Sequence, residues 1–476
     1  MNGFKKALAV FRKASREVPA YKKLLAKAKI IAADVKSIND FEKLPIINKE
    51  NYLKKNSLPQ LFPEQKIPPV AYASSGSSGQ PTFWFRDERL EQKGAKIHKI
   101  IFQKIFEIKK EEPTLVVICF SMGIWIAGNY TLDVCRRIAR SGYSLTLITP
   151  GIEKQDILSI LSRLAHQFKN IILAGYPPFL MDVLIEVKKK KVAINSRIRL
   201  LTAGDKFSEQ WRTDVMTLIQ TKKPGYIVSV YGCADAGVLG YETPLSIFLR
   251  RESAKNASLY KTLFGNEADI PSLVQYDPKD LFFEEKNGEL IFTVDTAIPL
   301  IRYNIHDFGR IINFEEAMEI LKDHGLDGKA KKIIRNWKLP FLVKKGRADV
   351  AVTFYALNIY PENIKAGLEN KTTVKYVTGN FFAYNKTVSK NRKQKFYLNV
   401  ELAQGVKTHK KIMALVQKQV VKALLTMNLE YRKLLSTIGN KALPVIKLVP
   451  CGSQQIRAKG VRVVFYQKDK KAQVLN

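Results

Sequence analysis

A dense run of serine and glycine is the stretch of this chain best suited to chemistry: Ser74-Ser75-Gly76-Ser77-Ser78-Gly79. Glycine allows backbone turns that aim successive N–H groups at one anion, and the hydroxyl groups add neutral donors. The same composition is typical of flexible linkers. The run lies between a proline-rich and an aromatic segment rather than between two domains, so we favour a phosphate-binding loop. No Gly-Lys-Ser/Thr follows it, which argues against a Walker-type nucleotide site.

Polar and aromatic residues also follow two apolar runs that we expect to be buried strands. Ligands bind at such strand ends in α/β sheets. An aromatic ring there can stack on a base, and a carboxylate can hold Mg²⁺. An ordinary turn is the alternative for the first segment. The residues are Gly204 and Asp205 after residues 198–203, and Tyr231, Gly232 and Asp235 after residues 226–230.

Three later segments complete the set of candidate residues. Asp307 lies among cationic and polar groups, with Arg310 close by, and could accept both hydroxyls of a ribose. Arg347 and Asp349 lie near an expected domain boundary. Lys459 is next to a glycine, so its ammonium group could approach a ligand with little hindrance, although a lysine near a chain end is usually a solvated charge.

Hydrophobic patterning indicates which elements must position these residues. Short apolar runs alternate with helix-like stretches from about residue 90 to 240, which predicts an α/β domain. After residue 240, hairpin signals such as residues 284–289 predict an antiparallel unit. We expect residues 322–345 to lead to a small α+β domain, and so predict domains at 1–345 and 346–476. The strands predicted first are residues 114–120, 144–149, 171–174, 198–203 and 226–230, and those of the small domain are 396–402 and 445–449, with a helix at 407–427.

Composition limits the function classes. With 476 residues and 46% hydrophobic content, the chain should form sizeable cores. No apolar stretch is long enough to span a membrane, and we expect a soluble cytoplasmic protein without a signal peptide. The four cysteines are scattered, which fits a reducing compartment. The net charge is +36, but lysine-rich clusters such as residues 188–191 are typical of solvated faces, so we do not expect nucleic acid as a partner.

In their order along the chain, these motifs resemble those of the adenylate-forming superfamily of acyl-CoA synthetases and AMP-dependent ligases, most closely the phenylacetate–coenzyme A ligase family. The serine and glycine run resembles that family's Ser-Ser-Gly-Thr-Thr-Gly-Lys-Pro-Thr loop. Residues 44–50 (Leu-Pro-Ile-Ile-Asn-Lys-Glu) are similar to Leu-Pro-Phe-Thr-Thr-Lys-Asp, and residues 121–125 continue the match. Residues 358–361 (Asn-Ile-Tyr-Pro) are similar to Asn-Val-Phe-Pro, so the resemblance covers nearly the whole chain.

The resemblance implies an α/β large N-terminal domain with an antiparallel β subdomain, followed by a small mobile α+β C-terminal domain. It also implies two half-reactions. A carboxylate attacks the α-phosphate of ATP to give an acyl-adenylate and pyrophosphate, and a thiol, usually coenzyme A, then displaces AMP. Because carboxylate and triphosphate repel each other, loop donors, Mg²⁺ and a lysine would have to neutralise charge. The expected ligands are therefore a carboxylic acid, ATP, Mg²⁺ and CoA.

The resemblance also assigns a role to each candidate residue. Lys459 would enter the site when the C-terminal domain closes, and leave it to make room for the thiol. Trp125 and Tyr176 would line an acyl pocket for an aryl or apolar acid, unless they are ordinary core aromatics. The remaining roles are phosphate binding for residues 74–79, adenine binding for Gly204, Asp205, Tyr231 and Gly232, Mg²⁺ binding for Asp235, ribose binding for Asp307, further nucleotide contacts for Arg310 and Arg347, and the hinge for Asp349.

Three departures from the family pattern leave alternatives open. Gln80 stands where the family loop usually has lysine, and Asp235 where it usually has glutamate. Residues 354–357 (Phe-Tyr-Ala-Leu) replace the usual Ile-Arg-Gly-Val, and this bulk would narrow the thiol channel. The acyl acceptor could therefore be an acyl carrier protein or an amine instead of CoA. A non-catalytic nucleotide-binding descendant is a further alternative.

Overall fold

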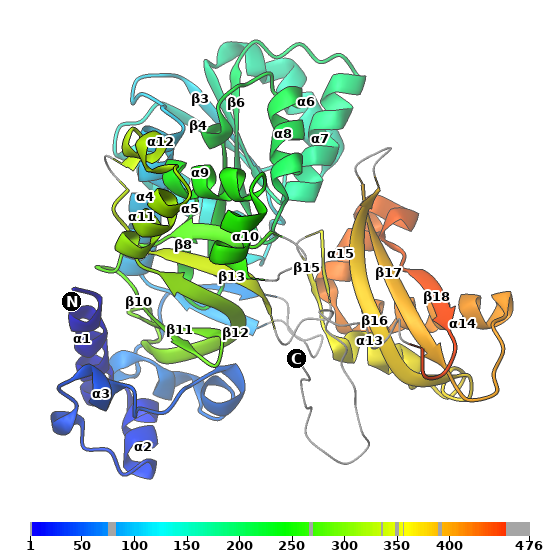
Figure 1. Cartoon of the computed structure of the whole chain (residues 1–476), viewed down its shortest axis with the longest axis horizontal. Coiled ribbons are helices and arrows are strands. Elements are labelled where there is room, and N and C mark those ends of the chain that lie inside the picture. The colour runs from blue at the N-terminus through cyan, green and yellow to red at the C-terminus, as the bar shows by residue number, and fades with distance from the viewer. Residues whose placement is uncertain are drawn as a thin grey trace. The chain divides into compact units, whose positions relative to one another are not determined.

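The computed structural model describes residues 2–74, 82–265, 270–334, 337–347, 352–355, 357–388 and 393–453. The chain divides into two compact units (Figure 1). Each unit contains a hydrophobic cluster of its own. The first unit comprises Met1–Tyr72, Phe83–Gly175 and Val187–Ala348, and the second Ala73–Thr82, Tyr176–Glu186 and Asp349–Asn476. Two short segments from the first half of the chain thus belong to the second unit.

A large mixed sheet dominates the first unit, and one half of it is parallel. The strand order there is β4-β3-β5-β6-β7, and neighbouring strands pair in parallel. β3 and β5 are buried along their whole length, as expected for strands with both faces covered. The sequence predicts all five strands, and the structure confirms them: β3 (Thr114–Cys119), β4 (Leu145–Ile148), β5 (Asn170–Gly175), β6 (Arg197–Ala203) and β7 (Ile227–Cys233).

Amphipathic helices connect these strands. α4 (Glu88–Ile100) packs against α5 (Ile126–Arg140), which also contacts β3. Figure 1 shows α6 (Lys154–Leu164) and α8 (Glu209–Leu218) next to each other on the opposite side of the sheet. The remaining connection, α7 (Pro177–Lys189), begins two residues after β5 ends.

The other half of the sheet is antiparallel. Asn287 and Gly288 join β10 to β11 with positive φ angles of 54° and 74°, which two-residue hairpin turns require. The predicted hairpin is therefore confirmed, although it extends the large sheet rather than forming a separate one. From β7 outward the strands are β8 (Gly237–Tyr241), β9 (Ser272–Gln275), β13 (Phe341–Arg347), β12 (Leu300–Ile312), β11 (Glu289–Val294) and β10 (Phe282–Lys286).

The prediction that residues 322–345 lead to a second domain is wrong at its C-terminal end. β13 begins at Phe341, and it pairs with β12 on one side and β9 on the other. Phe341, Leu342 and Val343 are fully buried. Pro340 interrupts the short apolar run from Leu339 to Val343, and two lysines follow it, so the run does not stand out as a strand by periodicity. Before it, α11 (Phe314–Asp323) and α12 (Asp327–Lys331) form a helical excursion.

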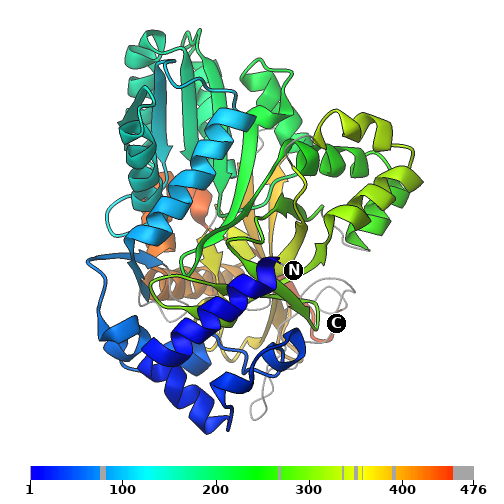
Figure 2. The same ribbon diagram turned by 90° about the vertical axis from the view of Figure 1, so that its left-hand side faces the viewer.

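N-terminal helices cover one end of the antiparallel half. α1 (Asn2–Glu17) packs against β10, β11 and β12, and Figure 2 shows it crossing them. Edge-to-face contacts join Phe11 to Tyr21 and Phe41, from the following α2 (Pro19–Lys27) and α3 (Ile38–Phe41). α9 (Pro244–Ser253) and α10 (Ala257–Phe264) complete the unit beside β9.

The second unit is built around a three-stranded sheet with the order β16-β17-β18. β16 and β17 pair antiparallel, whereas β17 and β18 pair in parallel, and α14 packs on β18. This arrangement of strands and helices is α+β, as predicted. The elements are β14 (Val352–Phe354), β15 (Leu357–Ile359), α13 (Pro361–Leu368), β16 (Val377–Val388), β17 (Lys393–Leu402), α14 (Lys410–Met427), α15 (Leu429–Ile438) and β18 (Val445–Val449).

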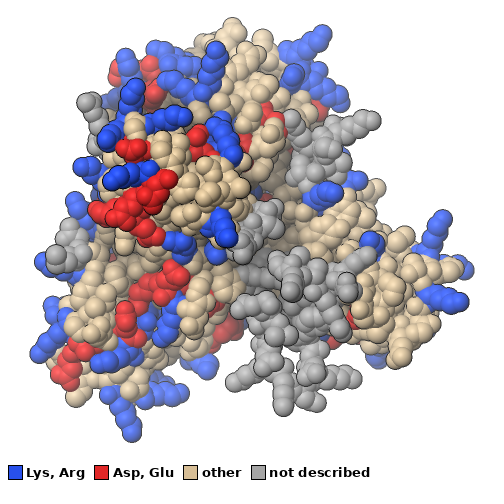
Figure 3. All heavy atoms as spheres, viewed as in Figure 1, with Lys and Arg blue, Asp and Glu red and all other residues tan. Residues whose placement is uncertain are grey.

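Figure 3 shows lysines and arginines scattered over the visible face, with acidic side chains among them. Among the described residues, no helix is long and apolar enough to cross a membrane.

Candidate functional site

The candidate residues of the first unit gather at the carboxyl ends of the parallel strands. The chain leaves β3 toward β4 and leaves β5 in the opposite direction, toward β6, so the sheet has a topological switch point between β3 and β5. Ligands bind in open α/β sheets outside the carboxyl ends of the strands, and the candidate residues lie along that edge at β6 and β7, beside the switch point rather than at it. Gly204 follows β6 with a φ angle of 87°, a left-handed conformation that favours glycine. Val230, next to Tyr231 on β7, pairs with Ala203 on β6, so these two strand ends are adjacent.

A hydrogen-bonded tyrosine–aspartate pair lies at the centre of this region. The hydroxyl of Tyr231 donates a hydrogen bond of 2.6 Å to Oδ2 of Asp307. Asp307 is 1% exposed, and the Nζ atom of Lys344 lies 3.8 Å from its Oδ1. The same ammonium group is 5.6 Å from the centroid of the Tyr231 ring. Three strands thus each place one side chain in this cluster. β7 provides the tyrosine, β12 the buried carboxylate and β13 the cation beside it.

Asp235 is held by a second tyrosine. It lies in the turn between β7 and β8 and accepts a hydrogen bond from the hydroxyl of Tyr303 on β12. A Cβ atom on Gly232 would lie 2.7 Å from the carbonyl oxygen of Gly237, so this turn needs a glycine to close. A single carboxylate fits a Mg²⁺ site, because Mg²⁺ usually keeps several waters and uses one or two carboxylates together with substrate phosphates.

Residues 44–50 hold the strand that carries Asp307. Ile47 pairs with Tyr303, with its N–H donating to the carbonyl of Arg302 at 3.1 Å. The carbonyl of Ile47 in turn accepts from the N–H of Asn304 at 2.8 Å. Residues 44–50 therefore act as a clamp on β12.

Arg302 completes this clamp from within the strand. It is 2% exposed and has a φ angle of 49°. Its guanidinium donates to the carbonyls of Glu42 and Leu44 and forms an ion pair of 2.9 Å with Glu284. Burial raises the pKa of Glu284, and the charge of Arg302 opposes that rise. The strained backbone conformation of Arg302 is thus retained because its side chain binds two carbonyl groups and a carboxylate.

Polar side chains in the second half of β12 contact neighbouring elements rather than the buried carboxylate. His306 has a φ angle of 61°, and its Nδ1 lies 3.1 Å from Glu289, which also accepts from the amide of Asn304 at 2.8 Å. Arg310 forms an ion pair with Glu316 and also donates to the carbonyl of Thr262 at 3.3 Å. The described contacts of Arg310 are therefore with the helices α10 and α11, and none is with Asp307.

A buried ion-pair network supports the loop after β6. Arg250 donates to the carbonyl of Phe207 and lies 2.7 Å from Glu209, whereas Arg212 bridges Glu209 and Glu242. Burial would raise the pKa of Glu209, but the charges of Arg212 and Arg250 outweigh it and hold the pKa below its usual value. Glu242 also accepts from the backbone N–H of Ser229 on β7 at 2.8 Å. The network therefore joins the ends of β6 and β7.

Several predicted residues lie elsewhere or outside the described residues. Trp125 is half-buried at the N-terminus of α5, beyond β3, and Tyr176 is half-buried directly after β5, in the second unit. Ser74 ends β1 (Val70–Ser74), which pairs with β2 (Thr82–Arg86). The backbone of Arg347 pairs with Asp307 across β12 and β13. Ser75, Gly76, Ser77, Ser78, Gly79, Asp349 and Lys459 lie outside the described residues.

Sequence reasoning missed two residues of the site. Tyr303 lies within the Asp307 motif but carried no role, because a tyrosine inside an apolar strand reads as core. Lys344 lies in the segment predicted to be a linker. Its proximity to Asp307 depends on the pairing of β12 with β13, and no local sequence pattern predicts that pairing.

Comparisons with known proteins place the fold. The chain matches no model of a known protein family and no curated protein. It does match solved structures of 2-hydroxyisobutyryl-CoA ligase. With the ligase in its thioesterification state, bound to 2-HIB-AMP and CoA, the TM-score is 0.61 at 15% identity, covering 94% of this chain and 86% of the ligase. Two postadenylation-state structures of the same ligase give TM-scores of 0.52 and 0.51, each at 15% identity and covering 95% of this chain and 86% of the ligase. The chain therefore has the adenylate-forming fold, with its large mixed α/β sheet.

Proposed function

We propose that this protein is an acid–thiol ligase of the phenylacetate–coenzyme A ligase type, which activates an aryl or apolar carboxylic acid with ATP. One observation carries the proposal: on the adenylate-forming fold, Tyr231 on β7 forms one cluster with Asp307 on β12 and Lys344 on β13. A buried carboxylate there suits the two hydroxyls of a ribose, and the neighbouring ring suits an adenine.

In the first half-reaction, a carboxylate oxygen of the acid bonds to the α-phosphorus of ATP, and the bond from that phosphorus to pyrophosphate breaks. Asp307 would orient the ribose, and Asp235 would take part in holding Mg²⁺, which neutralises phosphate charge. Residues 74–79 would bind the phosphates, and Lys459 would approach the reacting oxygens on closure about Asp349. In the second half-reaction, the CoA sulfur bonds to the acyl carbon, and the bond from that carbon to AMP breaks.

Acid-dependent exchange of pyrophosphate into ATP tests the first half-reaction, with Mg²⁺ present and without any thiol. A panel of aryl and fatty acids should include one that supports exchange, and Asp307→Asn should reduce that exchange by about 100-fold, because the ribose loses a charged acceptor. Glu316→Gln, which changes an acid paired with Arg310, is the matched control and should retain most activity.

Acceptor competition tests the second half-reaction. With the acid identified, CoA, an acyl carrier protein and a simple amine are offered together, and CoA should be the preferred acceptor. Absence of exchange with every acid, while ATP still binds, would contradict the ligase and favour a nucleotide-binding role. Pyrophosphate exchange without transfer to CoA would support an adenylating enzyme whose acyl acceptor is not CoA.

A further inference from the structure

Two segments of the candidate site have the same spacing, with a tyrosine four residues before an aspartate. Tyr231 lies on β7 and Asp235 in the turn after it, and Tyr303 and Asp307 both lie on β12. The hydroxyl of Tyr231 donates to Asp307 at 2.6 Å, and the hydroxyl of Tyr303 donates to Asp235. Each tyrosine therefore holds the aspartate of the other segment, and we call these two hydrogen bonds the crossed pairs.

The crossed pairs join two strands that are not neighbours in the sheet. In the strand order, β8, β9 and β13 lie between β7 and β12. The pairing of β12 with β11 shifts register between Asn304 and Phe308, and that of β7 with β8 shifts between Tyr231 and Gly232. Such bulges bend a strand and redirect its side chains. The two segments thus meet through side chains, at the places where both strands are irregular.

The two residues of the second crossed pair differ in conformational freedom. Tyr303 is 1% exposed, and its ring packs edge-on against Phe292, with the ring centroids 5.6 Å apart. Asp235 is only half-buried and lies in a turn. A partly exposed aspartate can adopt several rotamers, and fixing one of them costs entropy. The hydrogen bond from a tyrosine held in the core therefore selects the direction in which the Asp235 carboxylate points.

We propose that Tyr303 is a positioning residue for the metal-bound phosphates of the nucleotide. This role rests on the proposed function, in which Asp235 takes part in holding Mg²⁺ and Asp307 orients the ribose. Tyr303 acts through Asp235, whose carboxylate it aims, and it lies on the same strand as Asp307. β12 therefore aligns the carboxylate for the metal with the carboxylate for the ribose, as a nucleotide that uses both requires.

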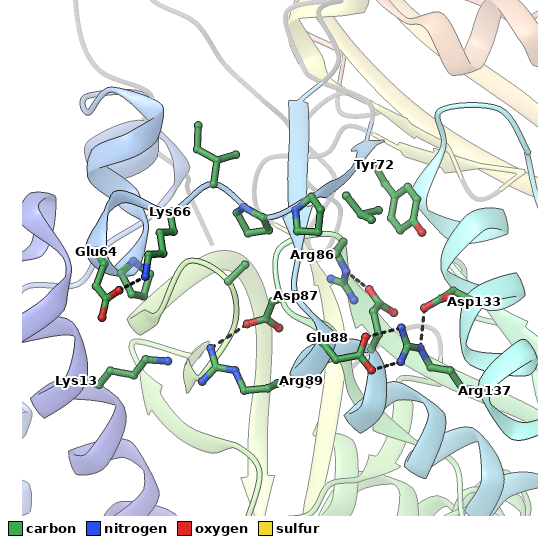
Figure 4. Close-up of a pocket in the computed structure, with 17 residues that line it drawn as sticks. Lys13, Glu64, Lys66, Tyr72, Arg86, Asp87, Glu88, Arg89, Asp133 and Arg137 are labelled. Carbon is green, nitrogen blue, oxygen red and sulfur yellow. Dashed lines mark hydrogen bonds and ion pairs between the residues drawn. The ribbon is translucent and has the colours of Figure 1, made fainter. Parts of the chain in front are cut away.

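The first unit also contains a cavity that other residues line. Its volume is about 580 Å³, within the usual range for small-molecule sites. Figure 4 shows ion pairs along its lining, of Arg137 with Glu88 and Asp133, and of Arg89 with Asp87. None of the described residues that line it belongs to the crossed pairs. Because a nucleotide could also enter this cavity, a variant of its rim, Arg89→Gln, serves as a control.

Calorimetric titration of the whole protein with two nucleotides tests this role. MgATP uses both carboxylates, whereas AMP in EDTA uses the ribose site and no metal. Tyr303→Phe should bind MgATP at least about tenfold more weakly than the parent, and AMP within about twofold of the parent. Tyr231→Phe should weaken the binding of both nucleotides by a similar factor, because it acts on Asp307. Tyr276→Phe and Arg89→Gln, both outside the crossed pairs, should leave both affinities within about twofold.

A double-mutant cycle shows whether Tyr303 acts through Asp235. In the Asp235→Ala background, Tyr303→Phe should change the affinity for MgATP by less than about twofold, because the carboxylate that it aims is gone. Equal losses of MgATP and AMP affinity in Tyr303→Phe would indicate a general structural effect and overturn the role, as would an unchanged affinity for MgATP. If the parent bound neither nucleotide, the proposed function would fail together with this role. If the parent binds both and supports pyrophosphate exchange, a negative result with Tyr303→Phe overturns the role of Tyr303 alone.

Discussion

At the residue scale, the pair of Tyr231 and Asp307 links the fold to the proposed chemistry. The hydroxyl of Tyr231 orients a carboxylate that is almost completely buried. Lys344 adds a positive charge on the other oxygen. A carboxylate held in this way points in one direction, as the recognition of two hydroxyls on one sugar requires.

Replacing Tyr231 by phenylalanine should therefore affect both stability and nucleotide binding. The buried carboxylate loses a hydrogen bond, which should lower the free energy of unfolding by about 1.5–3 kcal/mol. The affinity for ATP should fall by roughly tenfold, because Asp307 is no longer oriented. Urea unfolding and calorimetric titration with ATP measure the two effects. Tyr276→Phe is the control, since Tyr276 makes no hydrogen bond through its hydroxyl among the described residues, and an equal loss of ATP affinity there would contradict the assigned role.

At the element scale, β12 is the strand on which the candidate site depends. Arg302 ties it to the carbonyls of Glu42 and Leu44, and Ile47 pairs with it through the backbone. Replacing Arg302 by methionine should cost about 3–5 kcal/mol, because it leaves Glu284 buried without its ion pair. Arg302→Met/Glu284→Leu removes both charges and should be more stable than the single variant in urea titrations. If the double variant were no more stable, the ion pair would not be the source of the loss.

The elements that the sequence predicted correctly are those with a strong local sequence pattern. Strands β3 and β5 stand out as uninterrupted apolar runs, and the Asn287-Gly288 turn announces its hairpin. The sequence did not predict β13, because its buried part is only three residues long. The candidate site shows the same contrast between local and tertiary features. Tyr231 and Asp307 could be predicted from the sequence motifs that contain them. Their hydrogen bond, and that of Tyr303 to Asp235, joins residues far apart in sequence and depends on tertiary pairing.

At the scale of the whole molecule, the hydrophobic cluster around the antiparallel half of the first unit and the cluster of the second unit share no residue among those described. Tertiary contacts also assign residues 73–82 and 176–186 to the second unit, which no composition change in the sequence indicates. The predicted domain boundary at residues 345 and 346 stays a prediction. All four tryptophans, Trp84, Trp125, Trp211 and Trp337, belong to the first unit.

Unfolding should therefore occur in two steps that different probes separate. Tryptophan fluorescence should follow the first unit alone, whereas far-ultraviolet circular dichroism follows both. Leu398→Ala, in the core of the second unit, should destabilise that unit by about 2–5 kcal/mol and shift only part of the dichroism transition. If fluorescence and circular dichroism gave coincident transitions in the parent and in Leu398→Ala, and if the variant also shifted the fluorescence transition, the two units would unfold as one.

The clamp formed by residues 44–50 also has a consequence for synthesis on the ribosome. Ile47 leaves the ribosome early, but its partners Arg302, Tyr303 and Asn304 are made much later. At roughly 5–20 residues per second, the clamp stays without its strand for roughly 10–50 s. During that interval the nascent N-terminal helices expose the apolar side chains that later face β10, β11 and β12. Chaperone binding to the nascent chain should therefore persist until β12 has emerged.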